Sequence, residues 1–79
     1  MEVPLGVRLQ VVLSGEEDRT LRELRGATTV PQRVKDRAEV VRMNARGDPV
    51  KTIAAYFDWH LETVCSTLNR WQNGGLGGL

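Results

Sequence analysis

Four polar side chains near the C-terminus recur at the spacing of one helix face. They are Glu62, Thr63, Ser66 and Asn69. Residues three and four apart lie on the same side of a helix, so these side chains would point outward together. Carboxylate, hydroxyl and amide groups in such a row can hydrogen-bond to base edges in the major groove of DNA, where Asn suits adenine and Glu suits cytosine. We therefore predict that these residues read bases, with stabilisation of the helix start as an alternative role for Glu62.

A second group of side chains has the chemistry to bind phosphate. We predict DNA-backbone contacts from Lys51, Thr52, His60, Arg70, Arg42 and Arg46. Lys51 and Thr52 would lie at the start of a short helix, where free amides and the helix dipole attract anions. The basic residues of the 33–46 segment alternate with Asp36 and Glu39, so an ordinary solvated helix face explains them equally well.

The residue types argue against catalysis. Cys65 is the only cysteine and His60 the only histidine, which excludes an internal disulfide and a cysteine-rich zinc site. There is no glycine-rich phosphate loop and no nucleophile beside a base. His60 fits a helix cap better than a ligand, and Cys65 fits a half-buried small side chain better than a reactive thiol. We expect no enzyme activity, cofactor, metal or small-molecule substrate.

Length and composition are typical of one small soluble domain. The chain has 79 residues, and its 41% hydrophobic and 27% charged residues exclude a wholly disordered protein. The net charge of only +1 does not by itself indicate a nucleic-acid partner. No apolar run approaches the roughly 20 residues that span a bilayer, and the N-terminus lacks a signal-peptide pattern. We therefore expect a cytoplasmic protein without membrane contact.

Start and stop signals predict an all-α fold of about four helices, the first at residues 14–26. Ser14 and Glu17 form a capping box at its start, and Gly26 ends it. Residues 1–13 precede it as a short extended arm. Because the segment Val7–Leu13 is apolar and weakly alternating, it either packs on the helices or pairs two chains in a homodimer.

The second predicted helix begins at residue 29 or 30 and ends at Gly47. Thr29 and Gln32 can form a capping box, and Pro31 suits a first helical turn. One face repeats small and apolar side chains at helical spacing and is expected to be buried: Val34, Ala38, Val41 and Ala45.

Two further helices are predicted at about 49–57 and 60–72. Asp48 and Pro49 give the first an acidic cap followed by proline. Its apolar side chains are Val50, Ile53, Ala54 and Phe57, and those of the second helix are Leu61, Val64, Leu68 and Trp71. Asp58 occupies the turn position that often adopts a left-handed conformation, which Asp tolerates. Residues 14–73 therefore form a helix-turn-helix domain, and the glycine-rich residues 74–79 form a flexible tail or the start of a linker.

Four segments in this order resemble the N-terminal DNA-binding domain of insertion-sequence transposases related to the mariner group. They are Thr29–Ala38, Ile53–Phe57, Glu62–Val64 and Leu68–Trp71, followed by Gly-Gly-Leu-Gly-Gly-Leu. The resemblance covers about residues 14–79. It implies a homeodomain-like core of three helices, with residues 60–72 as the recognition helix in the major groove of double-stranded DNA.

In that family a catalytic domain with three acidic metal ligands follows the linker. This chain stops at Leu79, so we expect the DNA-binding portion alone, whether as a fragment, a relic or a free-standing regulator. Uncharged Cys65 and Ser66 stand where the family commonly has basic residues. Together with the weak net charge and the apolar arm, this leaves a second reading open: a protein-interaction or dimerisation module on the same fold.

Overall fold

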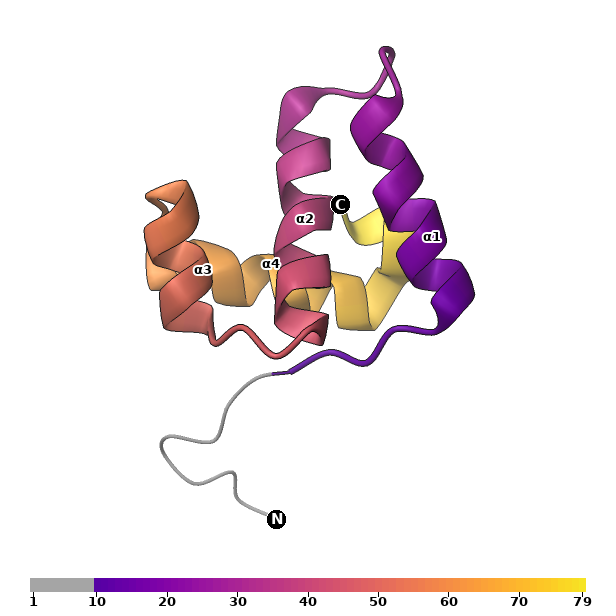
Figure 1. Ribbon diagram of the computed structural model, residues 1–79. Helices are drawn as coiled ribbons and strands as arrows, with labels where there is room; N and C mark the ends of the chain where they lie inside the picture. The colour runs from indigo at the N-terminus through magenta and orange to yellow at the C-terminus, as the bar shows by residue number, and fades with distance from the viewer. Residues whose placement is uncertain (1–9) are drawn as a thin grey trace.

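The computed structural model describes residues 10–79 (Figure 1). Over this range the elements are α1 (Gly15–Glu23), η1 (Leu24–Gly26), α2 (Gln32–Ala45), α3 (Val50–Phe57), α4 (Leu61–Gly74) and η2 (Gly75–Gly78), where η denotes a 3-10 helix. No strand occurs within it, so the predicted all-α fold is confirmed. Residues 1–9 of the predicted arm lie outside the described range.

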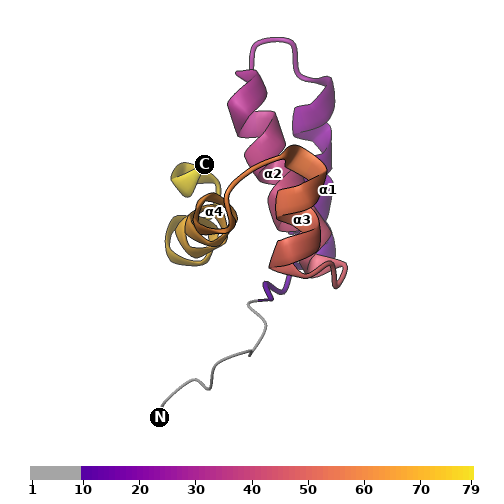
Figure 2. The same cartoon turned by 90° about the vertical axis from the view of Figure 1, so that its left-hand side faces the viewer.

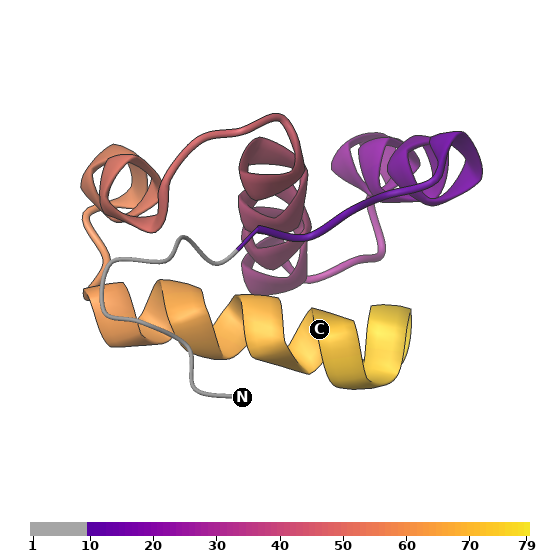
Figure 3. The same cartoon turned by 90° about the horizontal axis from the view of Figure 1, so that it is seen from below.

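The helices form two layers. α1 and α2 run antiparallel side by side, and α3 lies on the other side of α2. α4 crosses all three, behind them in Figure 1 and below them in Figure 3. α2 contacts α1, α3 and α4, and α4 also contacts α3. α2 is therefore the central helix, with partners on three sides.

The core lies between the two layers. Its fully buried apolar side chains are Leu21, Val40, Val41, Ile53, Val64 and Leu68. Of the predicted α2 face, Ala38 and Val41 are buried, whereas Val34 and Ala45 are half-buried. Val40 is also buried because a central helix is covered on more than one side.

The predicted core stripe of α4 is correct for Val64, Leu68 and Trp71 and wrong for Leu61. Leu61 is 50% exposed, and Thr67 is buried on the other flank of the stripe. The Thr67 hydroxyl donates to the carbonyl of Thr63 at 2.9 Å, so its burial leaves no unsatisfied polar group. The buried stripe is therefore rotated about the helix axis from the predicted one.

The first helix starts as predicted. The amide of Glu17 donates to the Ser14 hydroxyl at 3.0 Å, and the amide of Ser14 donates to the Glu17 carboxylate at 2.9 Å. This capping box satisfies two donors that the first turn of a helix leaves free.

The predicted caps of α2 and α3 are wrong. Each helix has a proline as its N-cap, Pro31 and Pro49, without a side-chain cap hydrogen bond. The prolines themselves have an extended ψ, 145° at Pro31 and 157° at Pro49, so each helix begins at the residue after its proline. Thr29 therefore lies too far upstream to cap α2, and the Asp48 carboxylate lies 4.0 Å from Arg46 instead of capping α3.

The side chain of Asn44 hydrogen-bonds both to the start of the described chain and to the loop between α2 and α3. Its side chain is 1% exposed, and its Oδ1 accepts from the amide of Val11 at 2.7 Å. Its Nδ2 donates to the carbonyl of Asp48 at 3.3 Å. Val11, the one buried residue of the 10–13 segment, is thereby held in the core.

The C-terminal residues, expected as a flexible tail, fold back on the helices. Gly75 to Gly78 form η2, and Leu79 is half-buried against the core. Arg37 on α2 donates from Nη1 to the carbonyl of Leu79 at 2.9 Å. A side chain at Gly78 would collide with the carbonyl of Arg70, so glycine permits the close approach of η2 to α4.

Candidate nucleic-acid interface

The turn between α3 and α4 is built around one left-handed residue. Asp58 has φ 58° and ψ 44°, as predicted. Two hydrogen bonds end α3 there: the amide of Trp59 donates to the Ala54 carbonyl at 2.9 Å, and the amide of Asp58 donates to the Ala55 carbonyl at 3.4 Å. This pattern of a helix end followed at once by a new helix fixes the angle at which the chain leaves the turn.

Apolar packing then holds α4 against α3. Ile53 and Ala54 on α3, and Val64 and Leu68 on α4, belong to one buried cluster. The small side chain of Ala54 suits a close crossing of the two helices. Around the turn, the rings of Phe57 and Trp59 lie 5.0 Å apart, so the larger Trp59 is accommodated by an aromatic contact.

The four predicted base-reading residues share one exposed face of α4. Glu62, Thr63, Ser66 and Asn69 are all exposed. Figure 2 views α4 nearly along its axis and shows α1, α2 and α3 together on one side of it. Asn73 lies on the same exposed face, one turn beyond Asn69, as its spacing of four residues indicates.

The starts of α3 and α4 present uncapped backbone amides. Pro49 and His60 are the two N-caps, and neither makes a side-chain cap hydrogen bond. His60 is therefore an N-cap residue by position but does not cap through its ring. Lys51 and Thr52 are exposed in the first turn of α3, and Arg70 is exposed near the end of α4.

Arg42 is part of an ion-pair network away from these residues. Its Nε lies 2.9 Å from the Asp18 carboxylate on α1, and its Nη1 lies 3.3 Å from Glu39. Its side chain is only 11% exposed. The hydrogen bond from Arg42 lowers the pKa of Asp18 below its ordinary value, and that carboxylate raises the pKa of Arg42.

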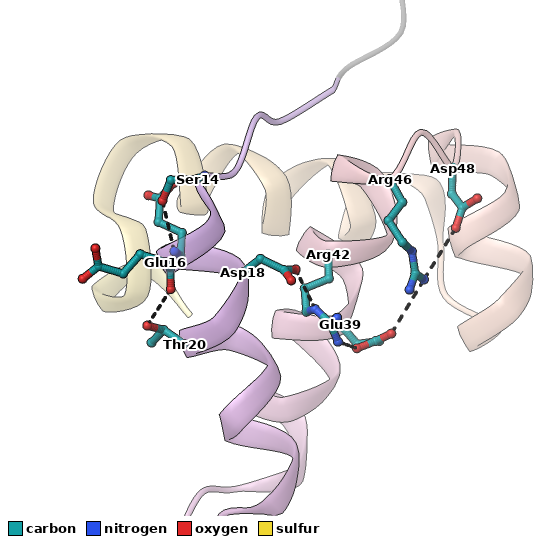
Figure 4. A network of polar contacts seen from close by, with 9 residues as sticks. Ser14, Glu16, Asp18, Thr20, Glu39, Arg42, Arg46 and Asp48 are labelled. Carbon is teal, nitrogen blue, oxygen red and sulfur yellow. Dashed lines mark hydrogen bonds and ion pairs between the residues drawn. The ribbon is translucent and has the colours of Figure 1, made fainter.

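Arg46 belongs to the same network. Its Nη2 lies 3.9 Å from Glu39 and 4.0 Å from Asp48. Figure 4 shows both arginines on the near side of α2, with α4 passing behind it. The structure therefore groups Arg42 and Arg46 with each other and not with the exposed face of α4.

No group of three metal-ligating side chains occurs within residues 10–79. Cys65 is a half-buried free cysteine, as predicted. In the same range, none of the helices has the length and apolar character needed to cross a membrane.

A short helix, a tight turn and a second helix with an open polar face define the helix-turn-helix class. A family model described as a homeodomain-like domain matches residues 31–79, more than half of the chain and all of α2, α3 and α4. The chain belongs to this family, which indicates DNA binding and is typically a non-catalytic module. Comparison with curated proteins and with solved structures gives no significant match.

Proposed function

We propose that this chain recognises a specific duplex DNA sequence by placing α4 in the major groove. The observation that carries the proposal is the uncovered polar face of α4, held outward by the buried side chains of its opposite face. A major groove about 12 Å wide admits one α-helix, and hydrogen-bonding side chains on the inserted face then read base edges.

The chemistry of each polar side chain suggests whether it contacts a base or a phosphate. Asn69 has the amide that pairs with adenine, Glu62 has the acceptor that suits cytosine, and Thr63 and Ser66 can pair with either base. Lys51, Thr52, His60 and Arg70 supply the phosphate contacts, assisted by the free amides at the start of α3. Contacts to phosphate fix the position of the domain, and contacts to bases fix the sequence.

We leave Arg42 and Arg46 out of this interface. Binding phosphate would require Arg42 to give up its hydrogen bond to Asp18 at 2.9 Å. Breaking a partly buried ion pair costs free energy that an exposed cation such as Lys51 does not lose. We assign Arg42 to the stability of the α1–α2 pair, and Arg46 to the C-terminal end of α2, where it lies near Glu39 and Asp48.

The base contacts are tested with variants of the full chain and fluorescence anisotropy on a sequence selected from random duplexes. Asn69→Ala should weaken binding to the selected duplex by about 1–3 kcal/mol, with little effect on an unrelated duplex. Gln32→Ala is the matched control, because it removes an exposed amide from the start of α2. Equal losses in both variants, or no sequence enriched from the random pool, would exclude base reading by α4.

The backbone contacts are tested in the same assay. Lys51→Ala and Arg70→Ala should weaken binding to every duplex alike, with Arg33→Ala, another exposed cation, as control. The absence of any salt-dependent affinity at low ionic strength would overturn the DNA-binding proposal as a whole.

The finer proposal is that the duplex target is the end of a mobile element. Its support is the resemblance of the four segments between Thr29 and Trp71 to transposase DNA-binding domains. Binding to duplexes carrying terminal inverted repeats should exceed binding to scrambled duplexes of the same composition. Equal binding to both would reject the transposase assignment and leave sequence-specific DNA binding intact.

A further inference from the structure

Leu61 is a large apolar side chain that the core of the protein leaves uncovered. It is the first residue of α4 and is 50% exposed, whereas Val64 and Leu68 on the same helix are fully buried. A single exposed leucine is ordinary on a protein surface, and its position in α4 is what gives Leu61 a role.

The exposed face of α4 has two unlike edges. At about 100° per residue, Leu61 and Cys65 lie along one edge of this face, and Thr63 and Arg70 lie along the other. Cys65 is half-buried, whereas Leu61, one turn before it, is exposed. The first edge is therefore apolar and most open at Leu61, and the second edge is polar and carries a cation.

Leu61 lies in the part of α4 that would come closest to the bases. The recognition helix of a helix-turn-helix domain contacts base edges with its N-terminal residues. Leu61 stands between His60, the N-cap, and Glu62, and both of these neighbours are exposed. With α4 in the major groove, Leu61 is therefore next to the base pair that Glu62 contacts.

The base edges in the major groove offer one apolar group. It is the C5-methyl group of thymine, and the other groups there are hydrogen-bond donors and acceptors. A leucine placed against a donor or an acceptor would displace water and replace none of its hydrogen bonds. A methyl group at C5 of a pyrimidine, as in thymine or 5-methylcytosine, is therefore the partner that suits Leu61.

We infer that Leu61 packs against the C5-methyl group of a pyrimidine beside the base pair contacted by Glu62, and thereby selects thymine at that position. This inference rests on the proposed placement of α4 in the major groove. Asn69 lies two turns further along α4, about 12 Å away along the helix axis, whereas successive base pairs are about 3.4 Å apart. Leu61 and Asn69 therefore contact different base pairs.

The experiment replaces each thymine of the selected duplex by uracil in turn, which removes the methyl group and leaves the hydrogen bonds of the base pair intact. Binding is measured by fluorescence anisotropy. At one position, uracil should weaken binding of the wild type by about fourfold, the effect of leaving one carbon group unburied. Leu61→Ala should bind the thymine and uracil duplexes equally at that position.

Leu76→Ala is the matched control. Leu76 is 48% exposed, almost as much as Leu61, and it lies in η2 beyond the end of α4. This variant should keep the preference of the wild type for thymine over uracil.

A second pair of duplexes separates the methyl group from the base that carries it. The selected thymine–adenine pair is replaced by cytosine–guanine in one duplex and by 5-methylcytosine–guanine in the other. The wild type should bind the methylated duplex more tightly than the unmethylated one, and Leu61→Ala should bind both equally.

A wild type that binds the selected duplex but tolerates uracil at every thymine would overturn this inference and leave the DNA-binding proposal standing. So would a selected duplex without any preferred thymine. A Leu61→Ala variant that keeps the full preference for thymine would also overturn it, because another residue then contacts the methyl group. A folding defect cannot imitate the expected result, since it weakens binding to the thymine and uracil duplexes by the same factor. Failure to select any duplex would overturn the DNA-binding proposal itself, and this inference with it.

Discussion

Asp58 is the single residue that allows α3 and α4 to meet at a tight corner. Its left-handed backbone is uncommon outside glycine, and this conformation costs Asp less free energy than it costs a β-branched residue. Both hydrogen bonds that end α3 depend on this conformation. The orientation of the α4 face therefore rests on one backbone angle.

We predict that Asp58→Val lowers the free energy of unfolding by about 1–2 kcal/mol, because valine disfavours the left-handed region. Asp58→Gly should cause no such loss, since glycine adopts this conformation freely. Urea denaturation of both variants beside the wild type measures the difference. Equal destabilisation by valine and glycine would show that the Asp58 side chain, and not its backbone, supports the turn.

The ion pair between Asp18 and Arg42 predicts a defined acid sensitivity. Arg42 holds the pKa of Asp18 in the folded state below its ordinary value, so the unfolded chain binds the proton more tightly. The stabilisation is complete above the ordinary pKa of Asp, about 4, and is lost as the pH falls through the lower folded value. Comparing the wild type with Asp18→Asn between neutral and strongly acidic pH, we expect their difference in unfolding free energy to shrink below about pH 4. A constant difference would contradict this assignment.

At the scale of the elements, Asn44 joins three parts of the fold through one buried amide. It bonds the amide of Val11 and the carbonyl of Asp48 while belonging to α2. We predict that Asn44→Ala lowers the free energy of unfolding by about 1–3 kcal/mol, because buried backbone groups lose their partner. Asn73→Ala, on the exposed face of α4, should change stability little. Amide hydrogen exchange at Val11 should accelerate only in Asn44→Ala.

The seating of η2 on α4 depends on the absence of a side chain at Gly78. Gly78→Ala should displace η2, since the added carbon collides with the backbone of Arg70. Gly77→Ala is the control, because an added carbon there meets open space. We expect NMR shifts of Arg37 and Leu79 to move in Gly78→Ala and to stay unchanged in Gly77→Ala. Similar spectra for all three proteins would mean that η2 does not dock this way in solution.

The sequence predicted helix starts, stops and turns correctly where they depend on neighbouring residues alone. The capping box of Ser14 and Glu17, the stop at Gly47 and the left-handed Asp58 each depend on neighbouring residues. The starts of α2 and α3 were predicted wrongly. Thr29 and Asp48 are residue types that often cap helices, but Pro31 and Pro49 occupy the N-cap positions. Burial of Thr67 and docking of Leu79 depend on distant partners, which spacing along the chain does not reveal.

For the candidate site, helical periodicity was sufficient to group Glu62, Ser66 and Asn69 on one exposed face. It could not show that Arg42 is engaged with Asp18, 24 residues earlier in the chain. A basic side chain looks equally available in the sequence whether it faces solvent or a carboxylate. The structure separates these cases by giving Arg42 a partner and leaving Lys51 and Arg70 exposed.

At the scale of the whole molecule, DNA affinity has to arise from few charges. The net charge is +1, and the proposed phosphate contacts on α3 and α4 are Lys51 and Arg70, with His60 at the start of α4. Neutralising two or three phosphates would give a plot of the logarithm of the binding constant against the logarithm of salt concentration with a slope of about −2 to −3. Titrations at several salt concentrations measure it. A much steeper slope would require Arg42, Arg46 or other basic residues at the interface.

The described helices differ in how many neighbouring helices they pack against. α1 packs on α2 and η1 without a close backbone approach to α3 or α4, and it precedes the 31–79 segment that defines the family. A helix anchored to one neighbour opens at lower free energy than a helix enclosed by several. On heating, α1 should therefore unfold first while α2, α3 and α4 stay packed together. The chain should then unfold in two stages, beginning at its N-terminal helix.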